Sequence, residues 1–176
     1  MHTILFETIE EKPKCVEDES AVNEDFAYEF LSGRGLCDYC SDMDNSDIES
    51  ALYMLSERFQ FSFDKYVDVY GEEFFGLNKE NISKFIKNFI NWSIKKAVKG
   101  KKNYDDFINN LENVKKGTET YNSMNEFYVR NAMDDKFDTM FYCDECNYTS
   151  LFNFVMYLNS SKIKEIYFIK VISVNY

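Results

Sequence analysis

The chain has 176 residues, of which 45% are hydrophobic and 18% aromatic, so it can bury a substantial core and is not disordered throughout. Its longest apolar runs fall far short of the roughly 18 residues that cross a bilayer, so we expect no membrane-spanning helix and no membrane partner. The net charge of −11 opposes long-range attraction to nucleic acid.

The charge is segregated along the chain. Residues 1–75 contain nineteen acidic and five basic residues, residues 76–116 contain four acidic residues and ten lysines, and residues 117–176 contain eight acidic and five basic residues. No Pro, Gly or Ser linker accompanies these shifts, so we expect one domain over residues 1–176. Its parts are an acidic N-terminal half (1–75), a Lys-rich helical hairpin (76–116) and an α/β C-terminal part (117–176).

The beginning of the chain shows no basic leader, long apolar core or small-residue cleavage site, which predicts a cytoplasmic protein. In that compartment the five cysteines are expected to be thiols, metal ligands or redox groups rather than a disulfide framework. The single proline and scarce arginine are typical of an AT-rich genome, as in low-GC bacteria, their phages and some large DNA viruses.

The first elements are taken from apolar periodicity and capping residues. Thr3–Ile9 is β-branched and apolar, which predicts a strand, and a loop around Pro13 follows. Ser20 is expected to begin a short helix that ends at Leu31. Residues 37–45 then form an acidic loop, and a capping box at Ser46 and Glu49 begins a helix over residues 47–58.

The central region contains the clearest helical pattern. Residues 59–75 fit both strand and helix periodicity, and we favour a helix for their second part. From Asn78 to Gly100 one helix face is apolar, and a second helix over residues 103–116 completes the hairpin. The apolar face consists of Ile82, Phe85, Ile86, Phe89, Ile90, Ile94, Ala97 and Val98.

The last third alternates between the two periodicities. We expect a helix over Met124–Met133, a strand over Phe137–Cys143, a helix over Thr149–Leu158 and a strand over Ile163–Val174. Strands near both ends of the chain predict an α+β fold. Its small antiparallel or mixed sheet is formed by the N- and C-terminal strands and covered on one face by the helical middle region.

Two CxxC pairs have the spacing of zinc ligands. Cys37 with Cys40, and Cys143 with Cys146, would together provide four sulfur atoms for one tetrahedral ion. Their neighbours are carboxylates, which raise thiol pKa values and oppose thiolate formation. Unligated cysteines are therefore the favoured interpretation, and we expect no cofactor, with zinc as the possible exception.

No pattern names a reaction. His2 is the only histidine, so nucleophilic triads that need histidine are disfavoured, and no phosphate-binding or dinucleotide-binding motif is present. Adjacent carboxylates are plentiful but are typical of a solvated acidic face. We therefore expect a protein that is not an enzyme, with a carboxylate or tyrosine site as the remaining alternative.

The lysines of residues 84–116, with Trp92 and Tyr104 nearby, have the composition of a nucleic-acid patch. A solvated helix face is the stronger explanation of these lysines, because the arginines that would bind phosphate are nearly absent. Direct binding of nucleic acid is not expected.

The acidic half suggests a surface for a basic protein. Several aromatic residues lie among its carboxylates, either as exposed contact residues or as core: Tyr28, Phe30, Tyr39, Tyr53 and Tyr70. The residues expected to bind the partner are Glu24, Asp25, Glu29, Asp38, Tyr39, Asp42, Asp44, Asp47 and Glu49. An acidic surface that only keeps the protein soluble is the competing interpretation.

In size, acidity and composition the chain resembles phage anti-defence inhibitors, including anti-CRISPR proteins, and the acidic immunity proteins that neutralise bacterial toxins. This resemblance implies a non-enzymatic inhibitor in the cytoplasm of a host cell, which docks on the cationic nucleic-acid-binding surface of a host effector. One alternative is a zinc-stabilised regulatory module. Another is an all-helical viral modulator of host signalling, similar in style to poxviral Bcl-2-like proteins.

Overall fold

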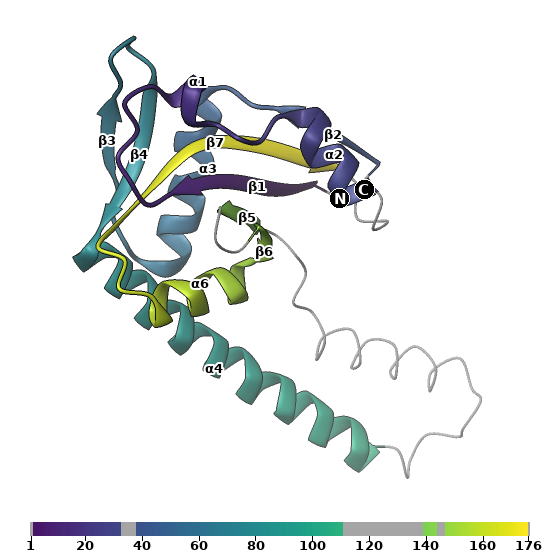
Figure 1. The fold of residues 1–176 in the computed structure, drawn as a ribbon. Coiled ribbons are helices and arrows are strands. Elements are labelled where there is room, and N and C mark those ends of the chain that lie inside the picture. Colours follow the sequence, from purple (N-terminus) through teal and green to yellow (C-terminus); the bar gives the residue numbers. More distant parts are fainter. Residues whose placement is uncertain (1, 33–37, 111–138, 144–146, 176) are drawn as a thin grey trace. The chain divides into compact units, whose positions relative to one another are not determined.

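The computed structural model describes residues 2–32, 38–110, 139–143 and 147–175. The order of elements confirms an α+β fold (Figure 1). They are β1 (His2–Ile9), α1 (Val16–Glu19), α2 (Glu24–Ser32), β2 (Tyr39–Asp42), α3 (Asn45–Phe59), β3 (Asp64–Val67), β4 (Glu73–Asn78), α4 (Lys79–Asn110), β5 (Thr139–Cys143), β6 (Asn147–Ser150), α6 (Leu151–Ser160) and β7 (Glu165–Asn175).

The chain divides into two compact units, residues 1–88 with 137–176, and residues 89–136. The first unit contains the whole sheet, and the second contains most of α4. The expectation of one domain over residues 1–176 stays a prediction.

Strand β7 organises a mixed sheet in the order β3-β4-β7-β1-β5-β6. One edge of β7 pairs with β1 in antiparallel register along nearly its whole length. Its other edge pairs with β4 up to Phe168 and with β2 from Ile172 onward. The parallel pairing of β1 with β5 makes the sheet mixed, which is one of the two arrangements that the sequence predicts.

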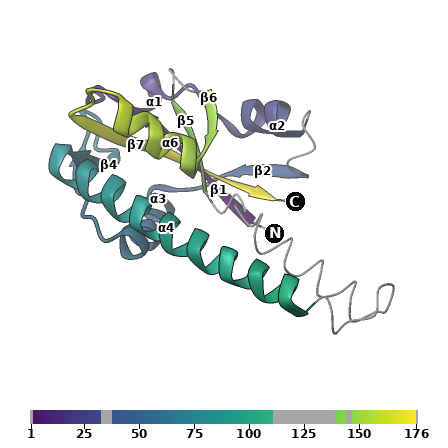
Figure 2. The ribbon, with the colours of Figure 1, turned by 90° about the horizontal axis from the view of Figure 1, so that it is seen from below.

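Helices cover both faces of this sheet (Figures 1 and 2). The consecutive residues Leu5 and Phe6 of β1 point to opposite faces, as strand geometry requires. Leu5 packs in a cluster with Ala27 and Leu31 of α2. Phe6 stacks at 5.7 Å, between ring centroids, on Phe141 of β5, which in turn stacks on Phe154 of α6. The sequence predicts a helical cover on one face only, whereas α2 and α6 lie on opposite faces of the sheet.

Both terminal strands lie where the sequence places them, but several expectations between them are wrong. The helix expected from Ser20 begins at Glu24. The loop expected over residues 37–45 contains β2, because an acidic edge strand gains its backbone hydrogen bonds from β7 whatever its own propensity. The helix favoured in the second part of residues 59–75 is the β3–β4 hairpin.

The β3–β4 turn is held by one carboxylate. Asp68 accepts hydrogen bonds from the backbone N–H groups of Tyr70 at 2.8 Å and Glu72 at 2.9 Å. A third comes from the N–H of Val16 at 2.9 Å, which ties the turn to α1. Gly71 supplies the positive φ of 98° that the turn requires.

The capped start of α3 is confirmed, with different capping residues. Asp44 accepts from the Asp47 N–H while Asp47 accepts from the Asp44 N–H, both at 3.1 Å, so these aspartates replace the expected Ser46 and Glu49. The Ser46 hydroxyl and the Asp47 N–H lower the pKa of Asp44.

Helix α4 differs from the expected hairpin because it continues through Gly100 to Asn110. Ile82 and Phe85 are buried, whereas Ile90, Ile94 and Val98 are 38%, 57% and 65% exposed. Apolar residues four apart advance about 40° around a helix of 3.6 residues per turn, so the expected apolar stripe winds away from the buried side. Within the described part of the chain, no helix is both long and apolar enough to cross a membrane.

Two expected segments cannot be compared with the structure. The remainder of the second hairpin helix beyond residue 110 and the helix over Met124–Met133 lie outside the described residues.

Gly76 is expected to tolerate no side chain. A Cβ atom there would lie 2.7 Å from Cδ1 of Tyr167 and 3.0 Å from Cε2 of Tyr66. Tyr167 is 3% exposed and its hydroxyl donates to Glu165 at 2.6 Å, so the ring has little room to move. We expect Gly76→Ala to lower the free energy of unfolding by about 1–3 kcal/mol in urea denaturation.

Gly100 provides the matched control, since it lies within α4 and a Cβ atom there meets nothing within 4 Å. Gly100→Ala is expected to stabilise the helix by about 0.5–1 kcal/mol. Equal stability of Gly76→Ala and the wild-type protein would contradict the packing described around Tyr167.

Candidate functional site

Helix α2 and strand β2 form an exposed acidic surface. Glu24, Asp25 and Glu29 of α2 are exposed, as are Asp38 and Tyr39 at the start of β2. We call these five residues the α2–β2 surface. Aromatic rings accompany them, because Phe26 and Tyr28 are 43% and 45% exposed and Tyr39 is 55% exposed. Carboxylates around exposed rings are suited to contact with a cationic partner.

The position of α2 is fixed by packing and by one hydrogen bond to β2. Phe30 is half-buried and stacks on Tyr148 with ring centroids 4.2 Å apart. The side-chain oxygen of Asn23 accepts from the Phe26 N–H at 2.8 Å and so caps the start of the helix. The Glu24 carboxylate accepts from the Asp42 N–H at 3.3 Å, which ties α2 to the last residue of β2.

The other four acidic residues expected to bind a partner have structural contacts. Asp42 lies 3.3 Å from the ammonium group of Lys170, and Glu49 lies 3.7 Å from that of Lys65. Asp44 and Asp47 form the capping box of α3. The expected set is thus divided between the α2–β2 surface and residues that stabilise the fold.

The expected exposure of the aromatic residues is confirmed for four of the five. Tyr28, Tyr39, Tyr53 and Tyr70 are 45–77% exposed. Tyr70 is the most exposed of them, in the turn that Asp68 holds.

A pocket of about 440 Å³ lies where the second edge of β7 passes from β4 to β2. Its apolar walls are Val16, Val22, Ile48 and Ile169, and its charged lining includes Glu17, Asp42, Glu72 and Lys170. Met43 also lines the pocket, and its backbone N–H donates to the Val171 carbonyl at 3.3 Å. The pocket belongs to the first unit and is of a size that holds a small molecule or a side chain.

A β-bulge explains why consecutive residues of β7 both reach this pocket. Glu7 pairs with Lys170 and Thr8 with Phe168, so Ile169 is an extra residue opposite β1. A bulge re-aims the side chains around it, which allows Ile169 and Lys170 to line the same pocket. Phe168 keeps its place on the opposite face, in edge contact with Phe6 at 5.5 Å.

Buried Glu7 holds one wall of the pocket in place. Its carboxylate accepts from the Ser20 hydroxyl and the Ala21 N–H, each at 2.6 Å, and from the Val22 N–H at 3.2 Å. Glu7 is only 3% exposed, and burial raises its pKa although these donors and the charge of Lys170 act in the opposite direction. The segment from Ser20 to Val22 is thereby fastened to β1.

Glu7 and Lys170 are not among the site residues that the sequence predicts. Each is the single charged residue of its stretch, Glu7 within residues 3–9 and Lys170 within residues 166–172. That pattern could have suggested that the two terminal strands pair and place these charges opposite each other. The register of β1 and β7 confirms this placement.

The two CxxC pairs are only partly within the described residues. Cys40 is half-buried, Cys143 is buried and disulfide-bonded, and Cys37 and Cys146 lie outside the described ranges. A zinc ligand must be a thiolate, which a disulfide sulfur is not. Over residues 2–32, 38–110, 139–143 and 147–175, no group of three or more His, Cys, Asp or Glu could hold a metal ion. A zinc site formed by the four cysteines stays a prediction.

No family model, curated protein or solved structure matches this chain.

Replacing Glu7 with glutamine is expected to change how stability depends on pH. The native state binds the Glu7 proton more tightly than the unfolded state, whose pKa is near 4.5. The stabilising contribution of Glu7 is therefore complete below pH 4.5 and is lost as the pH rises through the raised native pKa. We expect the unfolding free energy of the wild-type protein minus that of Glu7→Gln to fall over this range.

Urea denaturation at successive pH values measures this difference, and groups common to both proteins cancel. A difference that rises with pH would show that Lys170 and the three donors outweigh the burial of Glu7.

Proposed function

We propose that this protein is a non-enzymatic inhibitor that docks the α2–β2 surface on a cationic, nucleic-acid-binding surface of a host protein. In this proposal it acts in the cytoplasm of a host cell, as a phage or mobile-element product of the anti-defence, anti-CRISPR or toxin-immunity type. It covers the effector surface without binding nucleic acid itself.

The observation that carries the proposal is the exposure of carboxylates on a rigid support. Asp25 and Glu29 are four residues apart on α2, so they lie on the same side of the helix. The opposite side of α2 is fixed by Ala27 and Leu31, both with 0% exposure. A charged surface that is already ordered loses little entropy when a partner binds.

Three lysines of the first unit are paired with carboxylates outside the α2–β2 surface. Lys65 lies 2.6 Å from Glu73 and 3.7 Å from Glu49, and Lys170 contacts Asp42. The ammonium groups of Lys65 on β3 and Lys170 at the pocket are thus paired with carboxylates of the fold. Lys84 of α4 pairs with Glu80, one turn earlier in the same helix, at 2.7 Å.

The competing functions are not supported by a comparable observation. An all-helical Bcl-2-like modulator is wrong as a fold, because the described residues contain a seven-stranded sheet. The zinc-stabilised module stays a prediction, because two of its four cysteines lie outside the described residues. No site among the described residues favours an enzyme.

Salt dependence is the direct test of electrostatic docking. The test uses a panel of purified nucleases and nucleic-acid-guided effectors. We expect this protein to compete with nucleic acid for binding to at least one member of the panel. The competition should weaken as ionic strength rises, because screening reduces the attraction between exposed charges. Competition that does not change with salt concentration would contradict the proposal. So would a complete lack of competition across the panel, together with no partner captured from host lysate at any salt concentration.

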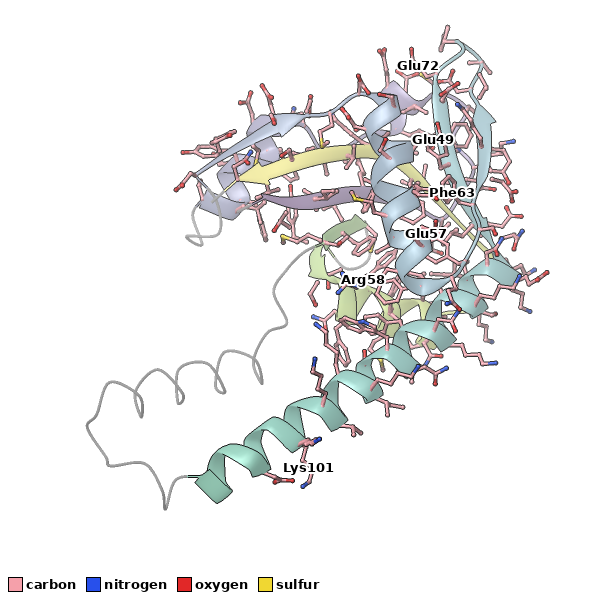
Figure 3. The ribbon with its side chains drawn as sticks, turned by 180° about the vertical axis from the view of Figure 1, so that it is seen from behind. Glu49, Glu57, Arg58, Phe63, Glu72 and Lys101 are labelled. Carbon is pink, nitrogen blue, oxygen red and sulfur yellow. The ribbon has the colours of Figure 1, made fainter. Side chains whose placement is uncertain are left out.

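Neutralising the α2–β2 surface is expected to weaken competition. Asp25→Asn with Glu29→Gln should reduce affinity about three- to tenfold at low salt and should flatten the salt dependence. Glu24 is left unchanged because it holds the Asp42 N–H. The matched control, Glu57→Gln with Asp64→Asn, removes the same charge at α3 (Figure 3) and at β3, and should change affinity less than twofold.

An equal loss in both double variants would assign the effect to net charge alone, which contradicts docking through α2 and β2.

A further inference from the structure

Helix α4 presents an exposed apolar stripe within the second unit. Ile90, Ile94 and Val98 are all exposed, and they follow one another at intervals of four residues. We call these three residues the α4 stripe. Residues at this spacing form a continuous ridge along a helix, and such ridges pack into the grooves of a second helix. Aliphatic side chains gathered on one exposed ridge therefore favour contact with an apolar partner surface.

A row of lysines runs beside the α4 stripe. Lys95, Lys99 and Lys102 are exposed and lie four and three residues apart, so they share one side of the helix. We call them the lysine row. Lys95 is three residues before Val98 and Lys102 is four residues after it, which places both next to the apolar ridge. The stripe thus has a positively charged border.

The charges of the lysine row are not offset by the fold. Lys101 pairs with Asp105, one turn later in α4 (Figure 3), and the ammonium group of Lys96 lies 4.5 Å from the centre of the Trp92 ring. Within the described part of the chain, by contrast, no ion pair involves a member of the lysine row. Its three positive charges can therefore meet incoming carboxylates.

We propose that the α4 stripe and the lysine row dock an acidic amphipathic helix of a partner protein. The apolar side chains of that helix, four residues apart, lie along the stripe, while its carboxylates face the lysine row. Apolar anchors give such a contact its affinity, and the charged border selects the partner. The inference does not rest on the proposed function, because α4 would receive a partner of the opposite charge.

Three other occupants match these features less well. If two copies of the chain paired through their stripes, one lysine row would approach the other, and like charges repel. An anionic membrane suits a wide apolar face, whereas three residues that advance about 40° each span only about 80° of the helix. A nucleic acid would neutralise the lysines but leave the aliphatic stripe in water.

The test adds a designed peptide to the full chain and follows the amide resonances of the chain by two-dimensional NMR. The probe peptide has about 16 residues, enough to form a helix, with a leucine at every fourth position and glutamates beside the leucines. The control peptide has glutamines in place of the glutamates. We expect saturable shifts at Ile90, Ile94 and Val98.

The comparison of the two peptides tests the role of charge. The glutamate peptide should bind about fivefold more tightly than the glutamine peptide at low salt. The net charge of −11 opposes the approach of the glutamate peptide, so only a local positive surface produces this preference. Equal binding of the two peptides, or shifts that lie outside α4, would overturn the proposal.

Two double variants test the role of the stripe. Ile90→Ser with Ile94→Ser should weaken binding of the glutamate peptide about tenfold, because apolar surface is lost from the contact. Val67→Ser with Val69→Ser removes exposed aliphatic surface from β3 and the turn after it, and should change binding less than twofold. All four side chains are exposed, so both variants should fold, which the dispersion of each spectrum reports. Equal weakening by both variants would overturn the proposal.

A second set of variants tests the lysine row. Lys95→Gln with Lys99→Gln should weaken binding of the glutamate peptide about three- to fivefold. Lys162→Gln with Lys164→Gln removes the same charge from exposed positions of the first unit and should change binding less than twofold. An equal effect of the two pairs would assign the preference to net charge and contradict docking on α4.

The same spectra separate the other occupants. Shifts at α4 with phosphatidylglycerol vesicles or a DNA duplex, but none with the glutamate peptide, would overturn the proposal in favour of those ligands. Self-association in sedimentation that Ile94→Ser abolishes would overturn it in favour of a second copy. None of these measurements uses a basic effector, so their failure leaves the salt-dependent docking of the α2–β2 surface intact.

Discussion

The pairing of β7 along both of its edges is the constraint on which the rest of the first unit depends. Ten of its eleven residues are buried or half-buried, since helices cover both faces of the sheet and strands occupy both edges. β1 and β5 follow on one edge, and β4 with β3 on the other. Long-range pairing of this kind brings the two ends of the chain together and satisfies their backbone hydrogen bonds.

The candidate site follows from how β7 shares its second edge. The pairing with β4 ends at Phe168 and the pairing with β2 begins at Ile172, and between them Ile169 and Lys170 line a pocket. The same arrangement sets β2 beside α2, where Glu24 contacts Asp42. The docking surface and the pocket are therefore neighbours through Asp42, which is common to both the β2 strand and the pocket lining.

Local pattern was sufficient for the terminal strands, the approximate start of α3 and the class of fold, although it named the wrong capping residues for α3. It failed where distant residues decide the outcome. The β2 segment is acidic and becomes a strand only by pairing with β7, and residues 64–78 become a hairpin through the turn held by Asp68. The exposure of Asp25 and Glu29 was predictable from composition, whereas the pocket depends on a bulge at Ile169 that leaves no local signal.

Native-state hydrogen exchange tests the central role of β7 most directly, because it measures the free energy of opening for each amide. Amides at the centre of β7, such as those of Phe168 and Ile172, should exchange only through global unfolding and be among the slowest in the chain. Those of the edge strand β3 should exchange through smaller local openings. Exchange of the central β7 amides as fast as that of β3 would contradict the account.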